Sequence, residues 1–156
     1  MGKLTVAEIR GCLFPEDLLY DQDLNIWFRQ IHPQMLEVGI TPFGLALSGE
    51  VYMFNPKPDG REIEFGRAFA LIEVAKTILP VRVPFACTVV SSNPAVVKSP
   101  DLIGRAPYSA WLARLSTTND DMLQSLISIV ALPSRAHALM DAHGFTSLET
   151  YLNHRQ

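Results

Sequence analysis

The sequence contains few cysteines, and this shortage limits what the protein can be. Only two of its 156 residues are cysteine, Cys12 and Cys87, so a framework of disulfides cannot hold the chain together. We also expect no signal peptide at the start of the sequence. Both features predict a reducing environment and therefore a cytoplasmic protein.

Charge is scarce as well, and long apolar runs are missing. Thirteen Lys and Arg stand against 16 Asp and Glu, a net charge of −3, which argues against the basic surface that nucleic-acid binders present. No apolar run approaches the roughly 20 residues of a membrane-spanning helix. Because 48% of the residues are hydrophobic and 19% charged, we expect an ordered domain with neither nucleic acid nor a membrane as partner.

Recognised catalytic motifs are also missing. The sequence has no phosphate loop, no dinucleotide fingerprint and no nucleophile-elbow serine. Cys12 has no obvious histidine partner, and Cys87 lies in a predicted strand, where a buried and inert thiol is expected. The histidines lack metal-ligand spacing and are expected at the surface: His32, His137, His143 and His154. We therefore predict no catalytic residues, no metal site and no enzyme.

The sequence does contain many short apolar runs separated by turn signals. The strongest turn signal is Asn55–Gly60, which holds two prolines, an aspartate and a glycine. Strand-like runs occupy residues 26–29, 35–40, 50–54, 61–66, 68–74, 78–83, 86–91 and 111–115, with a short helical run at 42–47. Many short strands at close spacing predict a mainly β sandwich or barrel.

Helical patterns are predicted at both ends of the chain. Thr5 and Glu8 have capping-box spacing, which predicts a short N-terminal helix that ends at Gly11. We therefore expect a β domain over residues 1–116 that includes this helix. Residues 117–156 are expected to form a helical extension packed on that domain.

Three helices are predicted within the extension. Asn119 caps the first, whose apolar stripe comprises Leu123, Leu126, Ile127 and Val130. Pro133 ends this helix, Ser134 caps a second that runs to Gly144, and Thr146 and Glu149 form a capping box for the last. The stripe packs on the β domain, or it is a partner-binding or dimer surface. A monomer or a weak dimer is expected.

One of only four lysines is singled out by its position. Lys76 lies between the apolar runs 68–74 and 78–83, which predict a β-hairpin with this residue at its tip. A lysine there projects into water, where the active site of another protein can reach it. The local pattern alone is more typical of an ordinary solvated turn lysine.

A family resemblance bears on this choice. The segment Glu73-Val74-Ala75-Lys76, with Pro84 downstream, resembles the lipoyl-lysine hairpin of glycine cleavage H proteins. The resemblance covers residues 16–115 in a shared register. Its further matches are Val38-Gly39-Ile40-Thr41, Gly49, Gly60, Gly66, Ser92-Asn93, Pro107-Tyr108 and Trp111, and Asn25-Ile26-Trp27 stands where the family has His-Glu-Trp.

The resemblance implies a fold, a cofactor and a role. The implied fold is the lipoyl/biotinyl-type flattened barrel or sandwich, a barrel-sandwich hybrid, here with a C-terminal helical extension. It implies lipoate attached covalently to Lys76, and Glu73 as a residue that the lipoate-attaching enzyme recognises. It also implies a carrier that presents the lipoyl arm to partner enzymes.

A second resemblance favours one relative over another. The segment Gly11–Tyr20 resembles the opening of the lipoate-binding proteins that serve the heterodisulfide-reductase-like complex of sulfur oxidation. Our leading hypothesis is therefore a lipoyl carrier for that complex in the cytoplasm. One alternative is the glycine cleavage carrier of an aminomethyl group, with the glycine cleavage enzymes as partners. The other is an unlipoylated scaffold, because Val74, Ala75 and Cys87 depart from the family pattern of small residues.

Overall fold

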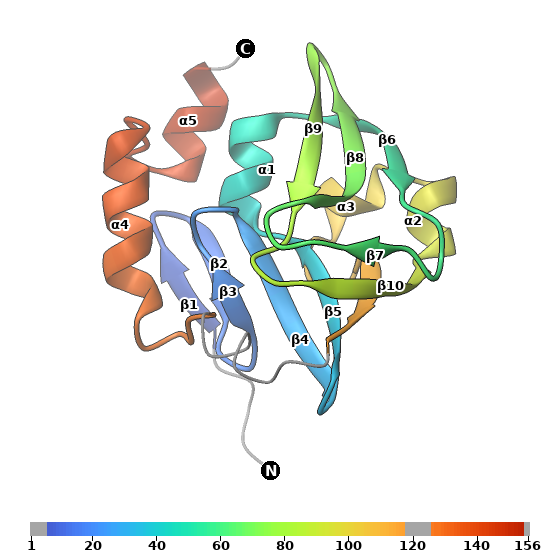
Figure 1. Ribbon diagram of the computed structural model, residues 1–156. Coiled ribbons are helices and arrows are strands. Elements are labelled where there is room, and N and C mark those ends of the chain that lie inside the picture. The colour runs from blue at the N-terminus through green and yellow to red at the C-terminus, as the bar shows by residue number, and fades with distance from the viewer. Residues whose placement is uncertain (1–5, 118–125, 155–156) are drawn as a thin grey trace.

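The computed structural model describes residues 6–117 and 126–154, which form three β-sheets and five helices (Figure 1). The strands are β1 (Val6–Ile9), β2 (Cys12–Pro15), β3 (Leu19–Asp21), β4 (Ile26–His32), β5 (Met35–Ile40), β6 (Val51–Pro56), β7 (Glu62–Ile63), β8 (Ala68–Val74), β9 (Thr77–Arg82), β10 (Cys87–Ser92) and β11 (Ala113–Ser116). The helices are α1 (Pro42–Ser48), α2 (Pro94–Lys98), α3 (Leu102–Arg105), α4 (Leu132–Ala142) and α5 (Leu148–His154).

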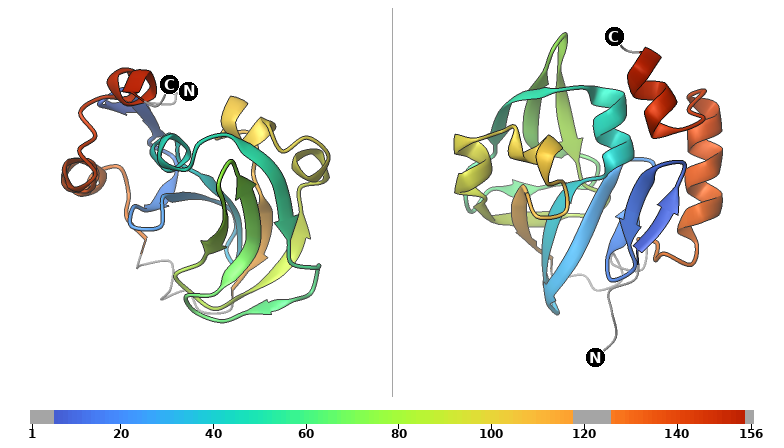
Figure 2. Two further views of the ribbon diagram at one scale, coloured as in Figure 1. Left: turned by 90° about the horizontal axis from the view of Figure 1, so that it is seen from above. Right: turned by 180° about the vertical axis from the view of Figure 1, so that it is seen from behind.

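Neighbouring strands in all three sheets are antiparallel. A six-stranded sheet has the order β3-β4-β5-β11-β10-β7, a three-stranded sheet has the order β6-β8-β9, and β1 pairs with β2 alone. Figure 2 shows α4 and α5 gathered on one side of the molecule, away from the three-stranded sheet. The mainly β fold with helices at its C-terminal end confirms the predicted fold class.

Two apolar clusters hold these parts together. The first joins the inward faces of the two larger sheets and includes Phe28 and Val38 of the six-stranded sheet with Phe54 and Ile72 of the three-stranded sheet. The second joins β1, β2 and α1 to the C-terminal helices, and its largest side chains include Trp27, Phe14, Tyr20, Phe43 and Phe145. The β8–β9 hairpin is therefore anchored by the first cluster, and α4 by the second.

The predicted short helix at 42–47 is confirmed. The side chain of Thr41 accepts a hydrogen bond from the Gly44 amide, and Pro42 occupies the first turn. Gly49, with φ of +88°, ends α1 and leads into β6. None of the helices in residues 6–117 and 126–154 has the length and hydrophobicity that a membrane-spanning helix requires.

The predicted N-terminal helix is wrong, because Val6–Ile9 is a strand. Ile9 pairs with Cys12, so Arg10 and Gly11 form a two-residue turn between β1 and β2. Their φ angles of +51° and +89° are those that a type I′ hairpin turn requires at both central positions. Gly11 is thus a turn residue of a hairpin and does not end a helix.

The predicted helices of the extension are only partly correct. Asn119 and Leu123 lie outside the described residues. Leu126 is buried, but Ile127 forms a β-bridge with Tyr20 and Val130 is 88% exposed, so the described residues 126–130 do not form the predicted helical stripe. The backbone N–H and C=O of Ile127 both form hydrogen bonds with the backbone of Tyr20, as in a pair of strands.

The last two helices exist, but they begin at other residues than predicted. Pro133 lies in the first turn of α4, where its missing N–H costs nothing, and Ala131 rather than Ser134 is the N-cap. Before α5, the Ser147 hydroxyl accepts a hydrogen bond from the Thr150 amide at 3.1 Å. Ser147 therefore fills the capping role that we predicted for Thr146.

Candidate functional site

The β8–β9 hairpin carries the candidate site at its tip. Val74 pairs with Thr77, so the two strands are joined by a loop of two residues, Ala75 and Lys76. Figure 1 shows this tip extending beyond α1 and β6. The structure thus confirms that Lys76 lies at the tip of a hairpin.

The loop tolerates the residues that this chain places there. In the described residues, positive φ angles outside glycine occur only at Arg10 and Asn25, so neither Ala75 nor Lys76 is left-handed. The loop is therefore neither a type I′ nor a type II′ turn and needs no glycine. Ala75 fits it without backbone strain.

The inward face of the hairpin fixes it to the body of the protein. Ile72 pairs with Leu79 on β9 and with Phe54 on β6, and Ile72 and Phe54 are both buried in the first cluster. Val74 and Val81 are buried on the same side of the sheet. These alternate positions bury apolar surface up to the residue that precedes the loop, so the tip has a fixed base.

Lys76 is exposed, and in the described fold it takes part in no ion pair. Its ammonium group can therefore extend away from the protein into solvent. An amine presented this way can enter the active site of another protein and be acylated there.

Glu73 lies three residues before Lys76 on the outward side of the sheet. It pairs with Met53 on β6 and with Ile78 on β9, and it is partly exposed. The structure therefore brings the two predicted site residues together on one hairpin. Glu73 stands beside the loop, within the surface that any protein acting on Lys76 would meet.

The two cysteines lie away from this surface. Cys12, the first residue of β2, is fully buried, and burial raises its thiol pKa to about 11. Cys87 lies in the six-stranded sheet, pairs with Ile63 and has its pKa raised by burial to about 12. Neither thiol is ionised near neutral pH, so both are packing residues of the fold.

The described part of the chain contains no cluster of three potential metal ligands. His32 and His137 are exposed, and His143 is exposed with its ring edge against Phe43. The side chain of His154 lies outside the described part. The histidines that are described thus occupy the surface, as predicted.

Sequence reasoning missed the outward side chains of the three-stranded sheet. Met53 is 48% exposed, Leu71 36% and Ile78 55%, although outward positions of such a sheet are usually polar. The signal was present in residues 78–83, whose run is apolar at both alternate sets of positions up to Arg82. A strand buried on one face should show only one apolar set.

The sequence of this chain is similar to those of known proteins. The family model described as glycine cleavage H-protein matches residues 18–136. The chain is 31% identical over 140 residues to glycine cleavage system H protein 3 of Aquifex aeolicus, which covers 89% of this chain and 87% of that protein. It is 30% identical over 140 residues to probable glycine cleavage system H protein 2 of Sulfurisphaera tokodaii, covering 88% and 95%.

A solved structure shares the fold. The crystal structure of a glycine cleavage system H protein from Mycobacterium marinum matches with a TM-score of 0.68, covering 80% of this chain and 99% of that one. The two sequences are 22% identical, so this likeness concerns the fold alone.

Proposed function

This chain belongs to the glycine cleavage H-protein family, and we propose that Lys76 is the residue that carries its lipoate. Members of the family are carrier proteins rather than enzymes, and they hold lipoate covalently on a lysine. The observation that carries the proposal is the place of Lys76, exposed in a two-residue loop at the tip of a projecting hairpin.

The surroundings of Lys76 fit an attached lipoyl group. Amide formation removes the positive charge of the amine, and because Lys76 has no ion-pair partner in the described fold, this loss breaks no ion pair. When bound, lipoate supplies two sulfurs that open to thiols and accept a transferred group. The chain supplies the rest: an anchored hairpin and a surface that partners recognise.

Glu73 has a separate role in this proposal. Its carboxylate stands beside the loop, where a lipoate-attaching enzyme that takes hold of Lys76 would contact it. We expect Glu73→Gln to lower the rate of lipoylation while leaving the final mass of the modified protein unchanged. Loss of the carboxylate removes a contact with the enzyme, whereas the amine that is modified stays in place.

Intact-mass measurement after incubation with purified lipoate-attaching enzyme, ATP and lipoate tests the attachment. One lipoyl increment is expected, absent from Lys76→Arg and present in Lys98→Arg, a matched change of an exposed lysine on α2. An unmodified wild-type mass with several attaching enzymes would instead favour the unlipoylated scaffold. An increment that persists in Lys76→Arg would move the site to another lysine.

For the group that is carried, we propose the aminomethyl group of glycine cleavage. The family match and the relatives named as H proteins support this choice. The lipoylated chain is expected to sustain glycine-dependent release of carbon dioxide with purified glycine decarboxylase, and Lys76→Arg is not. A fully lipoylated chain that fails with this enzyme would contradict the choice of group and leave the attachment site standing.

A second candidate is the carrier for a heterodisulfide-reductase-like complex of sulfur oxidation. The resemblance of Gly11–Tyr20 to the opening of such carriers favours it. Within that segment Cys12 and Phe14 are fully buried, and the neighbouring Arg10 carbonyl accepts a hydrogen bond from the Leu148 amide of α5. Binding of the lipoylated chain to the purified complex, with glycine decarboxylase as the competing partner, separates the two candidates.

A further inference from the structure

The outward face of the three-stranded sheet is a continuous surface that leads from Lys76 to a cluster of cations. Paired residues of neighbouring strands share a face, and positions two apart on one strand do too. We call the following side chains the outer face: Met53, Asn55, Leu71, Glu73, Ile78, Pro80 and Arg82. They form one row of Met53, Glu73 and Ile78, and a second row of Asn55, Leu71 and Pro80.

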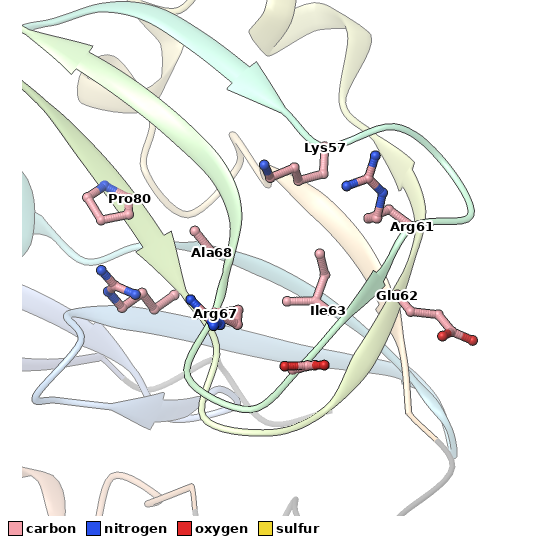
Figure 3. Close-up of a pocket in the computed structure, with 9 residues that line it drawn as sticks. Lys57, Arg61, Glu62, Ile63, Arg67, Ala68 and Pro80 are labelled. Atoms are coloured by element: carbon pink, nitrogen blue, oxygen red, sulfur yellow. The ribbon is translucent and has the colours of Figure 1, made fainter.

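Beyond these rows lies a hollow of about 410 Å³ that four cations line. We call it the basic hollow, and its cations are Lys57, Arg61, Arg67 and Arg82. Figure 3 shows Lys57 and Arg61 on neighbouring segments, with the Lys57 side chain extending away from Arg61, while Glu62 points outward. Glu62 and Glu64 also line the hollow, so its cations outnumber its carboxylates.

None of these four cations forms an ion pair within the described fold. The ion pairs found there join other residues, and among the four cations only Arg82 makes a side-chain hydrogen bond, to the Gly66 carbonyl at 3.2 Å. Gathering more cations than carboxylates in one hollow is unfavourable, and here it happens in a chain whose net charge is −3. The arrangement favours an incoming group of opposite charge.

The apolar rows between Lys76 and the hollow point to a protein as that partner. Met53, Leu71 and Ile78 expose apolar surface in the middle, with charge at one end, and a surface of this kind marks an interaction site. From Lys76 to Arg82 along β9 is about 20 Å at the usual rise per strand residue. A standard interface of about 800 Å² per partner covers that length.

We propose that the outer face and the basic hollow together are a docking surface for a partner protein whose own surface carries carboxylates opposite the hollow. Naming this partner as an enzyme that acts on a group attached to Lys76 rests on the proposed function. The arguments from charge complementarity and from the apolar rows do not depend on the proposed function. Charged contacts at the edge speed encounter and set orientation, which suits a carrier that must dock and leave quickly.

Titration of the unlipoylated, ¹⁵N-labelled full chain, followed by NMR, tests this proposal. The probe is a blocked peptide in which glutamate and leucine alternate. Amide shifts are expected on β6, β8 and β9 and around residues 57–67, with no comparable shifts on α4 or α5. Raising salt from about 0.05 M to about 0.5 M should weaken binding roughly tenfold, because the hollow contributes through screened charges.

A matched pair of charge reversals makes the test specific. Arg67→Glu is expected to weaken binding about fivefold, which corresponds to one surface charge contact. Arg135→Glu changes the net charge equally on the exposed side of α4 and is expected to leave the affinity within about twofold. Arg61→Gln provides a second, milder variant if Arg67→Glu does not fold.

Three results would overturn the proposal. Equal effects of Arg67→Glu and Arg135→Glu would mean that net charge alone governs binding. Shifts spread over the helical end, or no shifts, would mean that the outer face does not bind the probe. Equal shifts with inorganic phosphate at the same concentration would make the hollow a small-anion site. Because the protein is unlipoylated, none of these results depends on whether Lys76 is the attachment site.

Discussion

The helical end of the molecule buries large aromatic side chains such as Phe43 and Phe145, whereas the hairpin end leaves a row of apolar side chains open. Phe43 and Phe145 meet edge to face with ring centroids 4.9 Å apart, and both are fully buried. Met53 and Ile78 are 48% and 55% exposed. Burial at the helical end therefore stabilises the fold. The outward side of the hairpin exposes apolar side chains that contribute little to the stability of the isolated protein. Substitutions at the two ends should accordingly differ in kind.

The largest effect on stability is expected from Phe145→Ala. The ring lies between Phe43 and Tyr151, so its removal leaves a cavity and lowers the free energy of unfolding by about 3–5 kcal/mol. Denaturant unfolding followed by circular dichroism measures the change. Phe65→Ala is the matched control, because Phe65 is 68% exposed, and a change within about 0.5 kcal/mol is expected there. Similar losses for both variants would contradict the contrast between the two ends.

Gly39→Ala is expected to have the next largest effect. A Cβ at this position would lie 2.3 Å from the Trp27 ring, whose Nε1 donates a hydrogen bond to the Pro107 carbonyl at 3.0 Å. Trp27 is fully buried and cannot move aside freely, so a loss of about 1–3 kcal/mol is expected in denaturant unfolding.

Gly104→Ala is the control for that change. No atom lies within 4 Å of a Cβ added at Gly104 in α3, and alanine is the better helix former, so stability should stay the same or rise slightly. A gain of stability in Gly39→Ala would show that the Trp27 side chain repacks without cost.

A smaller effect is expected from the buried thiols at alkaline pH. Burial raises the pKa of Cys12 to about 11 and of Cys87 to about 12, from an ordinary value of 9.0. Because the folded pKa is the higher one, this contribution is full below pH 9 and is lost as pH rises toward 11 and 12. Stability of the wild type should fall over that range.

Buried tyrosines add to this loss, so the thiols need their own comparison. Burial raises the pKa of Tyr20 and Tyr108 as well, and their contribution falls with rising pH in the same direction. The difference between the unfolding free energies at pH 7 and pH 10 should therefore be smaller in Cys12→Ala than in the wild type. An unchanged pH dependence in that variant would mean that Cys12 does not ionise late in the folded protein.

Patterns along single segments allowed the hairpin and its tip to be predicted from the sequence. Residues 68–74 were expected as a strand and are β8, because buried Ile72 and Val74 alternate with outward positions. Lys76 follows from the same pattern, since two such strands in sequence leave the residues between them at the tip. The attachment of lipoate to it stays a prediction.

Features that depend on contacts between distant segments could not be predicted. The spacing of Thr5 and Glu8 suggested a helix, but pairing with β2 through the Arg10–Gly11 turn determines a strand instead. The spacing of Ile127 also suggested a helical stripe, but its backbone hydrogen bonds to Tyr20 hold it in a β-bridge. The basic hollow likewise gathers cations from β9 and from the segments before β7 and β8, and no local pattern unites them.

The smallest effect on stability, and the most direct probe of the hairpin end, is expected from Ile78→Ser. Ile78 is 55% exposed on an edge strand, so the free energy of unfolding should change by no more than about 0.5 kcal/mol. Binding of the glutamate–leucine peptide should nevertheless weaken about threefold or more, because the row of Met53, Glu73 and Ile78 supplies apolar contact next to Lys76. Val130→Ser removes another β-branched aliphatic side chain, 88% exposed at the helical end, and it should alter neither stability nor binding. Equal weakening in both variants would remove the distinction between the two ends, since any exposed apolar residue would then serve as well as Ile78.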